Sequence, residues 1–552
     1  MSHLHLPPVY SLRFFACFGW SYFLPLPLSL AADVEQADNL PVVTVLGGVA
    51  EHELPAGLAT PRATQRVGAS SNSVDRDVLG ALQPDRVEQL TGLIPGAHSG
   101  FEHGGLETGI RMRGFDVTRP RWNGLPDIHR LFVRDMYTVS EVEFVSGPDA
   151  ILEGVTSPGG AIRYVGRRPE YEPARELGVE VGEPGQRRVT LDSTGPVGED
   201  VAYRLTFAAQ DGETDPGQLS TRHYHALIGL AWHYSPRGEL RIEHERQRNQ
   251  RPYNMGTVIT ADGPVLDRAY HSSEQESKRE YERSALYWEH ELGASWSVSA
   301  KAAHARVERD ELLIGFWSGG ILPFPADDLD LLGYYAELED DYKQDDVRVQ
   351  IDWDGQLRGV GQHWVIGADW HRRDIAFRRT QAASQGWESQ YCVPVDGAAG
   401  EVIVASGTLE CVPGSGGQRI AFSELDLSSL ELASLQYRPE KTDRIGAYLA
   451  NRVRFTDYWR LGWGVRHTDY RIRAATEDDP QLREMADAGE LTWQWGTAIG
   501  SERLEVFANT GTGMELTGRV DADGNTLPPV MSQVLEAGCK LRPTPKQRIR
   551  MA

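Results

Sequence analysis

Residues 224–234 read YHALIGLAWHY, and the alternation in this stretch decides the class of fold. Apolar or aromatic side chains occupy every second position, from Tyr224 through Ile228 and Trp232 to Tyr234. Side chains at alternate positions lie on opposite faces of a β-strand. The stretch therefore predicts a long strand with one apolar face that ends in aromatic residues.

The same alternation recurs from about residue 175 onward, and no helical pattern interrupts it. It is clearest in residues 201–208, 347–354, 364–371 and 459–466. Soluble sandwiches and propellers also alternate in this way. A membrane β-barrel is favoured because the runs often reach roughly 8–12 residues, longer than the usual five or six. Aromatic ends on the apolar faces, and connections that alternate between short and long, favour it as well.

Charge and hydropathy exclude two other classes of protein. Lysine plus arginine number 56 and aspartate plus glutamate 79, so the net charge is −23. Nothing in such a chain offsets repulsion by phosphates, so we expect no nucleic-acid partner. The N-terminus alone carries a long apolar run, which excludes a multi-helix membrane protein because each helical span needs ~20 apolar residues.

Residues 1–31 are predicted to form a secretory signal peptide. Arg13 precedes an apolar segment from Phe14 to Leu30, and Ala31 completes a cleavage site with small residues. The alternative is a membrane anchor, which Pro25 and Pro27 disfavour because proline breaks a spanning helix.

Residues 32–66 have the composition of a linker with one apolar island, Leu40-Pro41-Val42-Val43-Thr44-Val45-Leu46. The island is β-branched and therefore extended. It is either a stray edge strand or a docking peptide that adds a strand to a partner's sheet.

Cys392 and Cys411 are expected to form a disulfide. They bracket a Gly- and Pro-containing segment, and nearby cysteines in a long loop of an exported protein usually pair. Cys17 leaves with the signal peptide. Cys539 lies in a strand-like stretch and is expected to be a small packed residue.

Residues 67–170 predict a small α+β domain. A helix pattern follows Asp85 and stops at Pro95-Gly96. Short alternating strands follow at 110–113 and 141–145, with a turn signal at Asn123-Gly124. If these strands share one sheet, Arg111 and Arg113 could face Glu141 and Glu143.

This domain resembles the plug of TonB-dependent outer-membrane receptors of the ferric-siderophore type. The motifs that carry the resemblance occur in order over about 80 residues. They are LTGLIPG at 90–96, IRMRGF at 110–115, VEFVSGP at 142–148, ILEG at 151–154, SPGGAI at 157–162 and RRP at 167–169. The strand-rich remainder is similar to the family's barrel.

The resemblance implies a membrane β-barrel of the 22-stranded type, with the N-terminal plug domain (67–170) in its lumen. The barrel is expected to occupy residues 175–552. These 378 residues hold roughly 14 or 15 candidate strands, too few for 22. The basic end at residues 548–552 also lacks a terminal aromatic residue. We therefore expect the barrel to be C-terminally incomplete in this chain.

The function implied is import of a ferric siderophore across the outer membrane with energy transmitted by TonB. The expected partners are the TonB complex of the inner membrane, the ferric siderophore and outer-membrane lipid. The TonB box would be Leu40, Pro41, Val42, Val43, Thr44 and Val45. No cofactor or protein-bound metal is expected, since the iron is carried only inside the siderophore chelate.

Alternatives remain open: a TonB-dependent receptor for cobalamin, haem or a glycan, or an exported soluble β-rich binding protein. An enzyme is not expected, because the sequence contains neither a GxSxG nucleophile elbow nor an HExxH motif.

By the same resemblance, outward-facing plug loops would contact the cargo, with help from a barrel loop. For each residue the alternative is an ordinary solvated loop side chain. The candidates are Phe101, His103, Arg119, Arg121, Trp122, His129, Arg130 and, in the barrel, Trp317.

Overall fold

The computed structural model describes most of residues 71–551. Within that range the gaps are 101–104, 118, 129–131, 148–150, 152–153, 183–184, 214–219, 254–258, 261–262, 265–275, 317–330, 383–387, 394–400, 412–416, 422–423, 427–429, 431, 438, 476–482, 502, 517–528 and 545–546. The predicted signal peptide and TonB box lie outside the described residues. So do the candidate residues Phe101, His103, His129, Arg130 and Trp317.

The first domain of the described chain contains two small sheets and three short helical segments. The five-stranded sheet has the order β1-β7-β8-β5-β6, and the three-stranded sheet has the order β2-β3-β4. The elements are β1 (Ser71–Val74), α1 (Arg76–Leu82), η1 (Val87–Leu93), β2 (Ala97–Ser99), β3 (Ile110–Met112), β4 (Phe115–Asp116), β5 (Arg121–Trp122), β6 (Leu125–Pro126), η2 (Met136–Thr138), β7 (Val139–Ser146) and β8 (Gly160–Gly166).

Two local expectations for this domain need correction. The segment after Asp85 is a 3₁₀ helix (η1) rather than an α-helix, since the amide of Ile94 bonds to the carbonyl of Thr91 three residues back. The ten residues between Pro84 and Pro95 leave little room for α-helical turns. Strand β3 does not share a sheet with β7, so Arg111 does not face Glu141 or Glu143. Arg111 instead donates to Asp116 at 2.7 Å.

The core of this domain is apolar and closely packed. Leu90, Trp122, Val142 and Phe144 have no exposed surface. The sheet supplies these side chains from β5 and β7, and η1 covers them with Leu90. The domain therefore has a hydrophobic core of its own beneath the barrel wall.

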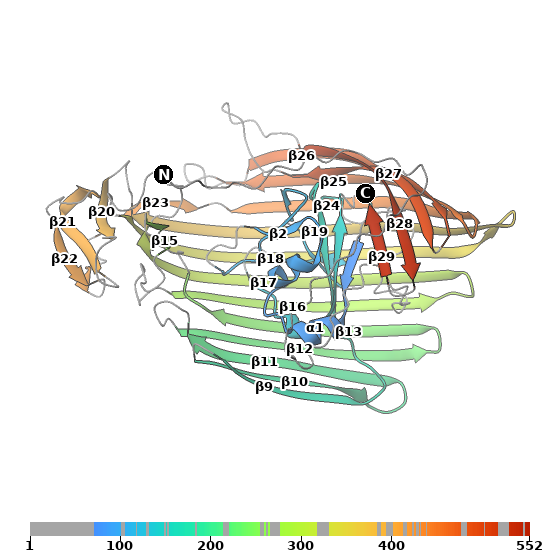
Figure 1. Ribbon diagram of the computed structural model, residues 1–552, viewed down its shortest axis with the longest axis horizontal. Coiled ribbons are helices and arrows are strands. Elements are labelled where there is room, and N and C mark those ends of the chain that lie inside the picture. Colours follow the sequence, from blue (N-terminus) through green and yellow to red (C-terminus); the bar gives the residue numbers. More distant parts are fainter. Residues whose placement is uncertain are drawn as a thin grey trace, which may run out of the picture. The chain divides into compact units, whose positions relative to one another are not determined.

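The rest of the described chain forms an antiparallel β-barrel (Figure 1), in which neighbouring wall strands follow one another in sequence. Among the described residues this order holds 19 strands, including β20, β21 and β22 of the small sheet described below, and so fewer than the 22 that the family resemblance implied. The first elements are β9 (Ala174–Gly182), β10 (Gln186–Pro196), β11 (Val201–Glu213), β12 (Ser220–Ser235), β13 (Gly238–Gln250), β16 (Glu276–Glu291), β17 (Trp296–Phe316), β18 (Leu331–Leu357) and β19 (Val360–Ala382). They are followed by β23 (Leu432–Tyr437), β24 (Glu440–Thr456), β25 (Trp459–Ala474), β26 (Arg483–Gly500), β27 (Leu504–Glu515), β28 (Val530–Thr544) and β29 (Gln547–Met551).

The two ends of the barrel differ in the length of their connections. At one end, the short-turn end, strands are joined at 197–200, 236–237, 292–295 and 358–359. The opposite end, the long-loop end, carries longer connections, including a hairpin of β14 (Ile259–Thr260) and β15 (Gly263–Pro264). In outer-membrane barrels the short turns are periplasmic and the long loops are extracellular.

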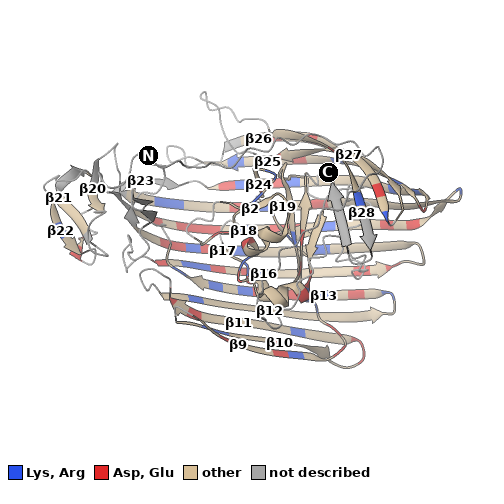
Figure 2. Cartoon of the chain, in the orientation of Figure 1, with Lys and Arg blue, Asp and Glu red and all other residues tan. Residues whose placement is uncertain are grey.

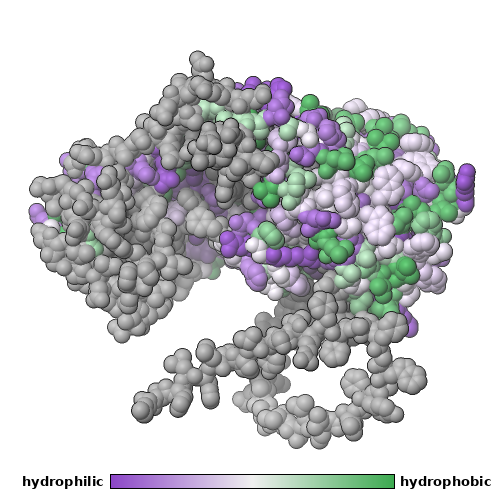
Figure 3. Space-filling model, turned by 90° about the horizontal axis from the view of Figure 1, so that it is seen from above, coloured by the Kyte–Doolittle hydropathy of each residue, from purple (hydrophilic) through white to green (hydrophobic). Residues whose placement is uncertain are grey.

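The alternation in the wall separates an apolar outer face from a polar inner face. On β12, Ile228, Leu230 and Trp232 point outward and are each nearly half exposed, whereas His225, on the opposite face of the same strand, is buried. Charged residues occur along the wall strands (Figure 2), and green hydrophobic patches cover parts of the described surface (Figure 3). This surface suits a wall that faces lipid. No helix among the described residues is long and apolar enough to cross a membrane.

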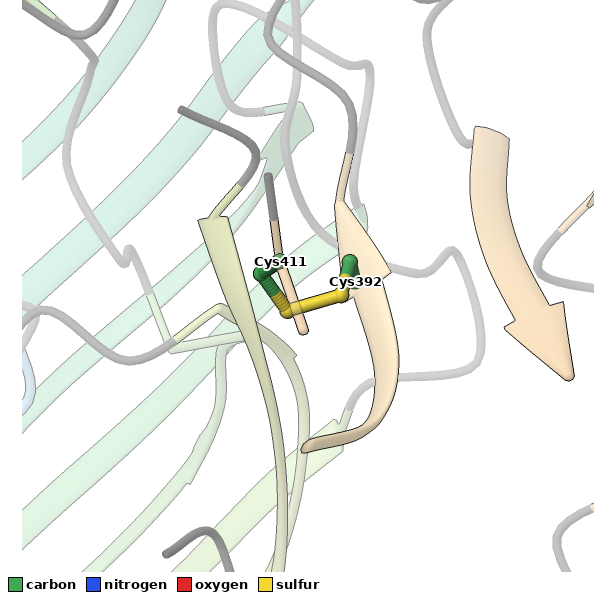
Figure 4. The surroundings of a disulfide bond; sticks show 2 residues. All are labelled: Cys392 and Cys411. Atoms are coloured by element: carbon green, nitrogen blue, oxygen red, sulfur yellow. A yellow bond between two sulfur atoms is a disulfide. The ribbon is translucent and has the colours of Figure 1, made fainter. Parts of the chain in front are cut away.

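A small sheet at the long-loop end contains β20 (Glu388–Val393), β21 (Glu401–Glu410) and β22 (Gln418–Ala421). Figure 1 places it beyond the ends of the long strands β18 and β19. Cys392 and Cys411 are joined in a disulfide beside this sheet (Figure 4), in agreement with the sequence analysis. Both half-cystines are buried against Ile403.

The N-terminal domain is a plug, because its residues contact inward-facing side chains on strands from β10 to β28. The contacts join Asp135 to Arg188, Asn123 to Glu243, Asn123 to Lys301, Gly124 to Arg348, Ile151 to Arg466, Thr156 to Met514 and Arg113 to Glu536. Several of these contacts are ionic or charge-assisted. The plug is thus held in the lumen by polar bonds together with separate apolar contacts, such as that of Phe132 with Tyr281 and that of Ile151 with Tyr448.

Candidate ligand-binding cavity

A cavity of about 380 Å³ lies between the plug and the barrel wall at the long-loop end. Its wall residues come from the ends of β10, β11, β12, β13 and β16 that lead to the longer connections. Its plug residues come from the loop before η1, from Gly105-Leu106 and from residues 133–135. A volume of this size falls within the usual range for small-molecule sites.

Basic side chains outnumber acidic ones in this lining. The arginines are Arg86, Arg134, Arg188, Arg222, Arg251 and Arg279, joined by His223; the acids are Asp85, Asp135 and Glu213. Arginine presents a planar set of N–H donors that matches carboxylate and other paired oxygen atoms. The cavity is therefore suited to an anionic, oxygen-rich ligand.

Two arginines position the plug loop at Gly105–Glu107. Arg86 donates to the carbonyl of Gly105 at 3.2 Å and to that of Glu107 at 2.8 Å. From the wall, Arg279 donates to the carbonyl of Leu106 at 2.8 Å. Gly105 has a φ of +82°, a conformation that glycine adopts without steric cost. This loop is consequently held between plug and wall at the edge of the cavity.

Asp135 connects the plug to the wall at the cavity. It caps η2 by accepting from the amide of Tyr137 at 2.9 Å, and Arg188 donates to both of its carboxylate oxygens at 2.7 and 2.9 Å. His223 Nε2 lies 2.8 Å from the same carboxylate. Burial raises the pKa of Asp135, but the hydrogen bonds from His223 and Arg188 outweigh burial and hold that pKa below its usual range.

Arg134 anchors the floor of the cavity. It donates to Asp127 at 2.7 Å and to the hydroxyl of Tyr281 at 3.3 Å, and it also pairs with Glu245 of β13. Its guanidinium lies 4.0 Å from the ring centroid of Trp122. The guanidinium of Arg134, which is held by Asp127, Tyr281 and Glu245, is therefore a structural link between the plug and the wall.

Three of the sequence-predicted cargo residues are described. Arg121 and Trp122 are buried, whereas Arg119 is half-buried. Burial, together with the nearby cations Arg373 and Arg444, lowers the pKa of Arg119 to about 9. Arg119 therefore belongs to a separate basic cluster, and its contact with cargo stays a prediction.

The expectation that Trp122 faces the outer vestibule is wrong in this structure. Trp122 has no exposed surface, and its ring fills space that any side chain at Gly166 would occupy, since a Cβ there would lie 2.4 Å from the indole. The adjacent turn at Asn123-Gly124 contacts Glu243 and Lys301, which lie in the halves of β13 and β17 nearest the short turns. The β5–β6 hairpin thus points toward the short-turn end.

The sequence analysis missed the wall residues of the cavity, including Arg188, His223, Arg251 and Arg279. One signal was available: His223 and His225 interrupt the inward face of the same strand on which Tyr224 and Ile228 mark the outward face. Only the plug, which is remote in sequence, makes that inward face part of a cavity.

A barrel with an apolar outer face and a lumen filled by a plug is the architecture of an outer-membrane transporter. The chain belongs to the family of TonB-dependent receptors, because the model of the TonB-dependent receptor-like β-barrel matches residues 231–545 and that of the TonB-dependent receptor plug domain matches residues 63–161. It is accordingly an outer-membrane protein, and its family and fold are those of receptors rather than enzymes.

Relatives and solved structures agree with this assignment. The chain is 22% identical over 544 residues to the metal-pseudopaline receptor CntO of Pseudomonas aeruginosa, which covers 93% of this chain and 71% of that protein. It is 25% identical over 232 residues to the ferrioxamine B receptor of Salmonella typhimurium, covering 40% of this chain and 32% of the relative.

The fold is similar to that of the siderophore receptor PiuA from Acinetobacter baumannii, with a TM-score of 0.69 and 14% identity over 86% of this chain and 70% of that one. BauA, the ferric preacinetobactin receptor of the same organism, gives a TM-score of 0.68 and 16% identity over 88% of this chain and 70% of that one. At these identities the likeness concerns the fold alone.

Proposed function

We propose that this receptor binds a ferric siderophore in the cavity at the long-loop end and imports it with energy transmitted by TonB. The observation that carries the proposal is the arginine-rich cavity between plug and wall. It lies on the side of the plug from which an extracellular ligand would arrive. The printed names of the relatives, which include a ferrioxamine B receptor and a metal-pseudopaline receptor, support a metal chelate as cargo.

The charge of the cavity supports an anionic chelate over the other cargo classes. A siderophore presents carboxylate, hydroxamate or catecholate oxygens around iron, and guanidinium groups recognise such oxygens in pairs. The protein then supplies no ligand to the iron, which stays enclosed in the chelate. Neutral glycans would gain much less from this set of arginines.

Import requires that the plug loosen after the cargo binds. Asp135 and Arg134 tie the plug to Arg188 and Glu245 of the wall through buried ion pairs. Separating a buried ion pair has a large free-energy cost, because it leaves a buried charge without its partner. Thermal motion alone therefore does not open the lumen. A pull from TonB on the N-terminal segment would supply the missing free energy, and the box proposed for that pull is Leu40–Val45.

The experiment is uptake of radioactive iron by cells whose own siderophore receptors are deleted and which express this receptor. A panel of ferric hydroxamates, catecholates and carboxylates would be compared with haem and labelled cobalamin. We expect TonB-dependent uptake of at least one anionic ferric chelate. Uptake of haem or cobalamin, with none of the chelates, would overturn the assignment of cargo.

A further inference from the structure

Three potential metal ligands meet where the plug touches the wall. Asp135 lies at the start of η2, and His223 and His225 lie two residues apart on β12, so both histidines face inward. Each residue offers one ligand atom, and these atoms all lie within 4.8 Å of one another. Asp135 and His225 are buried, while His223 is half-buried and lines the cavity.

The hydrogen bonds of the two imidazoles leave Nδ1 of His225 for a ligand, whereas Nε2 of His223 would exchange its contact with Asp135 for the metal. His225 Nε2 lies 2.7 Å from Glu245 Oε1, and among the described residues its buried Nδ1 has no hydrogen-bond partner. His223 Nδ1 contacts Asn249, and its Nε2 is directed to Asp135. Metal-binding histidines typically give their second nitrogen to a carboxylate or carbonyl in this manner, which fixes the ring.

We propose that Asp135, His223 and His225 bind a divalent transition-metal ion such as Zn²⁺, which would bridge the plug to strand β12. Two imidazoles and one carboxylate form a ligand set for zinc that leaves a position open to water. The cavity that Asp135 and His223 line gives the ion its path of entry. This ion is distinct from the cargo's iron, and the proposal does not rest on the proposed function.

Binding exchanges a proton for the ion. Because a ligating imidazole nitrogen carries no proton, a bound ion would replace the hydrogen bond between His223 Nε2 and Asp135, and the proton of that bond would leave to solvent. Arg188 occupies two acceptor positions of the carboxylate and holds it in place, while an ionised carboxylate has about four such positions.

The neighbouring charged side chains determine the affinity of this site for a divalent ion. Arg188 and Arg134 oppose a dication, and Glu245, which contacts both Arg134 and His225, offsets them. We therefore expect weaker binding than at an all-cysteine structural zinc site. The ion would act as a link between the plug and the wall.

The test uses the purified, tag-free mature chain in detergent, stripped with a chelator and titrated with Zn²⁺ in a calorimeter. The parent should bind one equivalent more tightly than His223→Gln and His225→Gln, by at least about tenfold. His233→Gln is the matched control, because His233 lies on the same strand but is exposed and paired with Glu239. Equal affinity in the parent and in the His223→Gln/His225→Gln double variant would overturn the proposal.

A second measurement on the parent alone covers the case in which a variant misfolds. Zn²⁺ should slow amide hydrogen exchange in η2, because Asp135 would be tied to β12 by the metal. Co²⁺ should give the visible absorption of an ion with nitrogen ligands and fewer than six ligands in total. Unchanged exchange in η2 together with the spectrum of hydrated Co²⁺ would refute the site.

Discussion

Arg251 lies at the edge of the cavity, with its guanidinium beside Gly105 of the plug. Three residues earlier on the same stretch of chain, Arg248 points to the outer surface, where it pairs with Glu280 and is 55% exposed. The two arginines share charge, size and neighbourhood in sequence. They differ in which face of the barrel wall they occupy.

Replacing Arg251 with alanine should weaken binding of an anionic ferric chelate by about tenfold to a hundredfold. The reason is loss of a charge-assisted contact worth ~1.5–3 kcal/mol. Quenching of intrinsic tryptophan fluorescence by the chelate measures the affinity. Arg248→Ala is the control and should bind like the parent. Equal affinity in both variants would exclude Arg251 from the site.

Trp122 has a structural role in the plug core. Replacement by alanine should destabilise the plug by ~3–5 kcal/mol, as expected for deletion of a fully buried indole. Hydrogen exchange of the amides in β7 and β8 measures this loss. Trp232→Ala, a change on the exposed outer face, should leave plug exchange unaltered. Slow exchange retained in Trp122→Ala would contradict the packing role.

At the scale of elements, the small sheet β20–β22 depends on a covalent link. Residues 388–421 form it at the long-loop end, where Cys392, Ile403 and Cys411 make one small buried cluster, while Tyr391, Val393 and Val402 pack into a second cluster with side chains of β17 and β18. A disulfide restricts the unfolded chain and so stabilises a sheet too small to persist alone.

Cys392 and Cys411 should resist a maleimide label until a reductant is added. The double variant Cys392→Ser/Cys411→Ser should lose ~3 kcal/mol of local stability in this sheet, in the chain-entropy account of a loop of this length. Faster hydrogen exchange confined to β20–β22 is the expected readout. Cys539→Ser, which alters a buried cysteine of β28 outside this disulfide, is the control. Labelling of both cysteines without reductant would disprove the bond.

At the scale of the whole molecule, the proposed function places cargo binding and energy supply in separate parts of the chain. The cavity is built by the plug and the wall, whereas the predicted TonB box precedes the plug in sequence. A peptide that adds a strand to a partner's sheet transmits force through backbone hydrogen bonds and contributes nothing to the cavity.

Deletion of Leu40–Leu46 should therefore abolish energised uptake and leave chelate affinity unchanged. Uptake of labelled iron and fluorescence quenching measure the two properties on the same variant. Replacement of residues 52–58 by an equally long Gly-Ser segment is the control for linker length and should import normally. Normal uptake after the deletion would show that the box lies elsewhere.

Sequence alone predicted the barrel and the disulfide from local signals, and it predicted the plug from the resemblance of its motifs to those of a known family. Alternation along a strand, turn residues and paired cysteines are local signals, and each constrains the chain within a few residues. The apolar outer face of β12 could be predicted from Tyr224, Ile228 and Trp232, because lipid imposes that pattern on every wall strand.

Tertiary structure alone decided which polar residues meet. Trp122 was predicted to face cargo, yet Gly166 leaves space for its ring and the β5–β6 hairpin points to the short-turn end. Asp135 and His223 are 88 residues apart, and no sequence pattern spans that distance. Their meeting requires the plug to sit inside the closed barrel, where burial favours pairing between polar groups of the plug and the wall. The site therefore belongs to the packing of plug against wall, which local sequence does not encode.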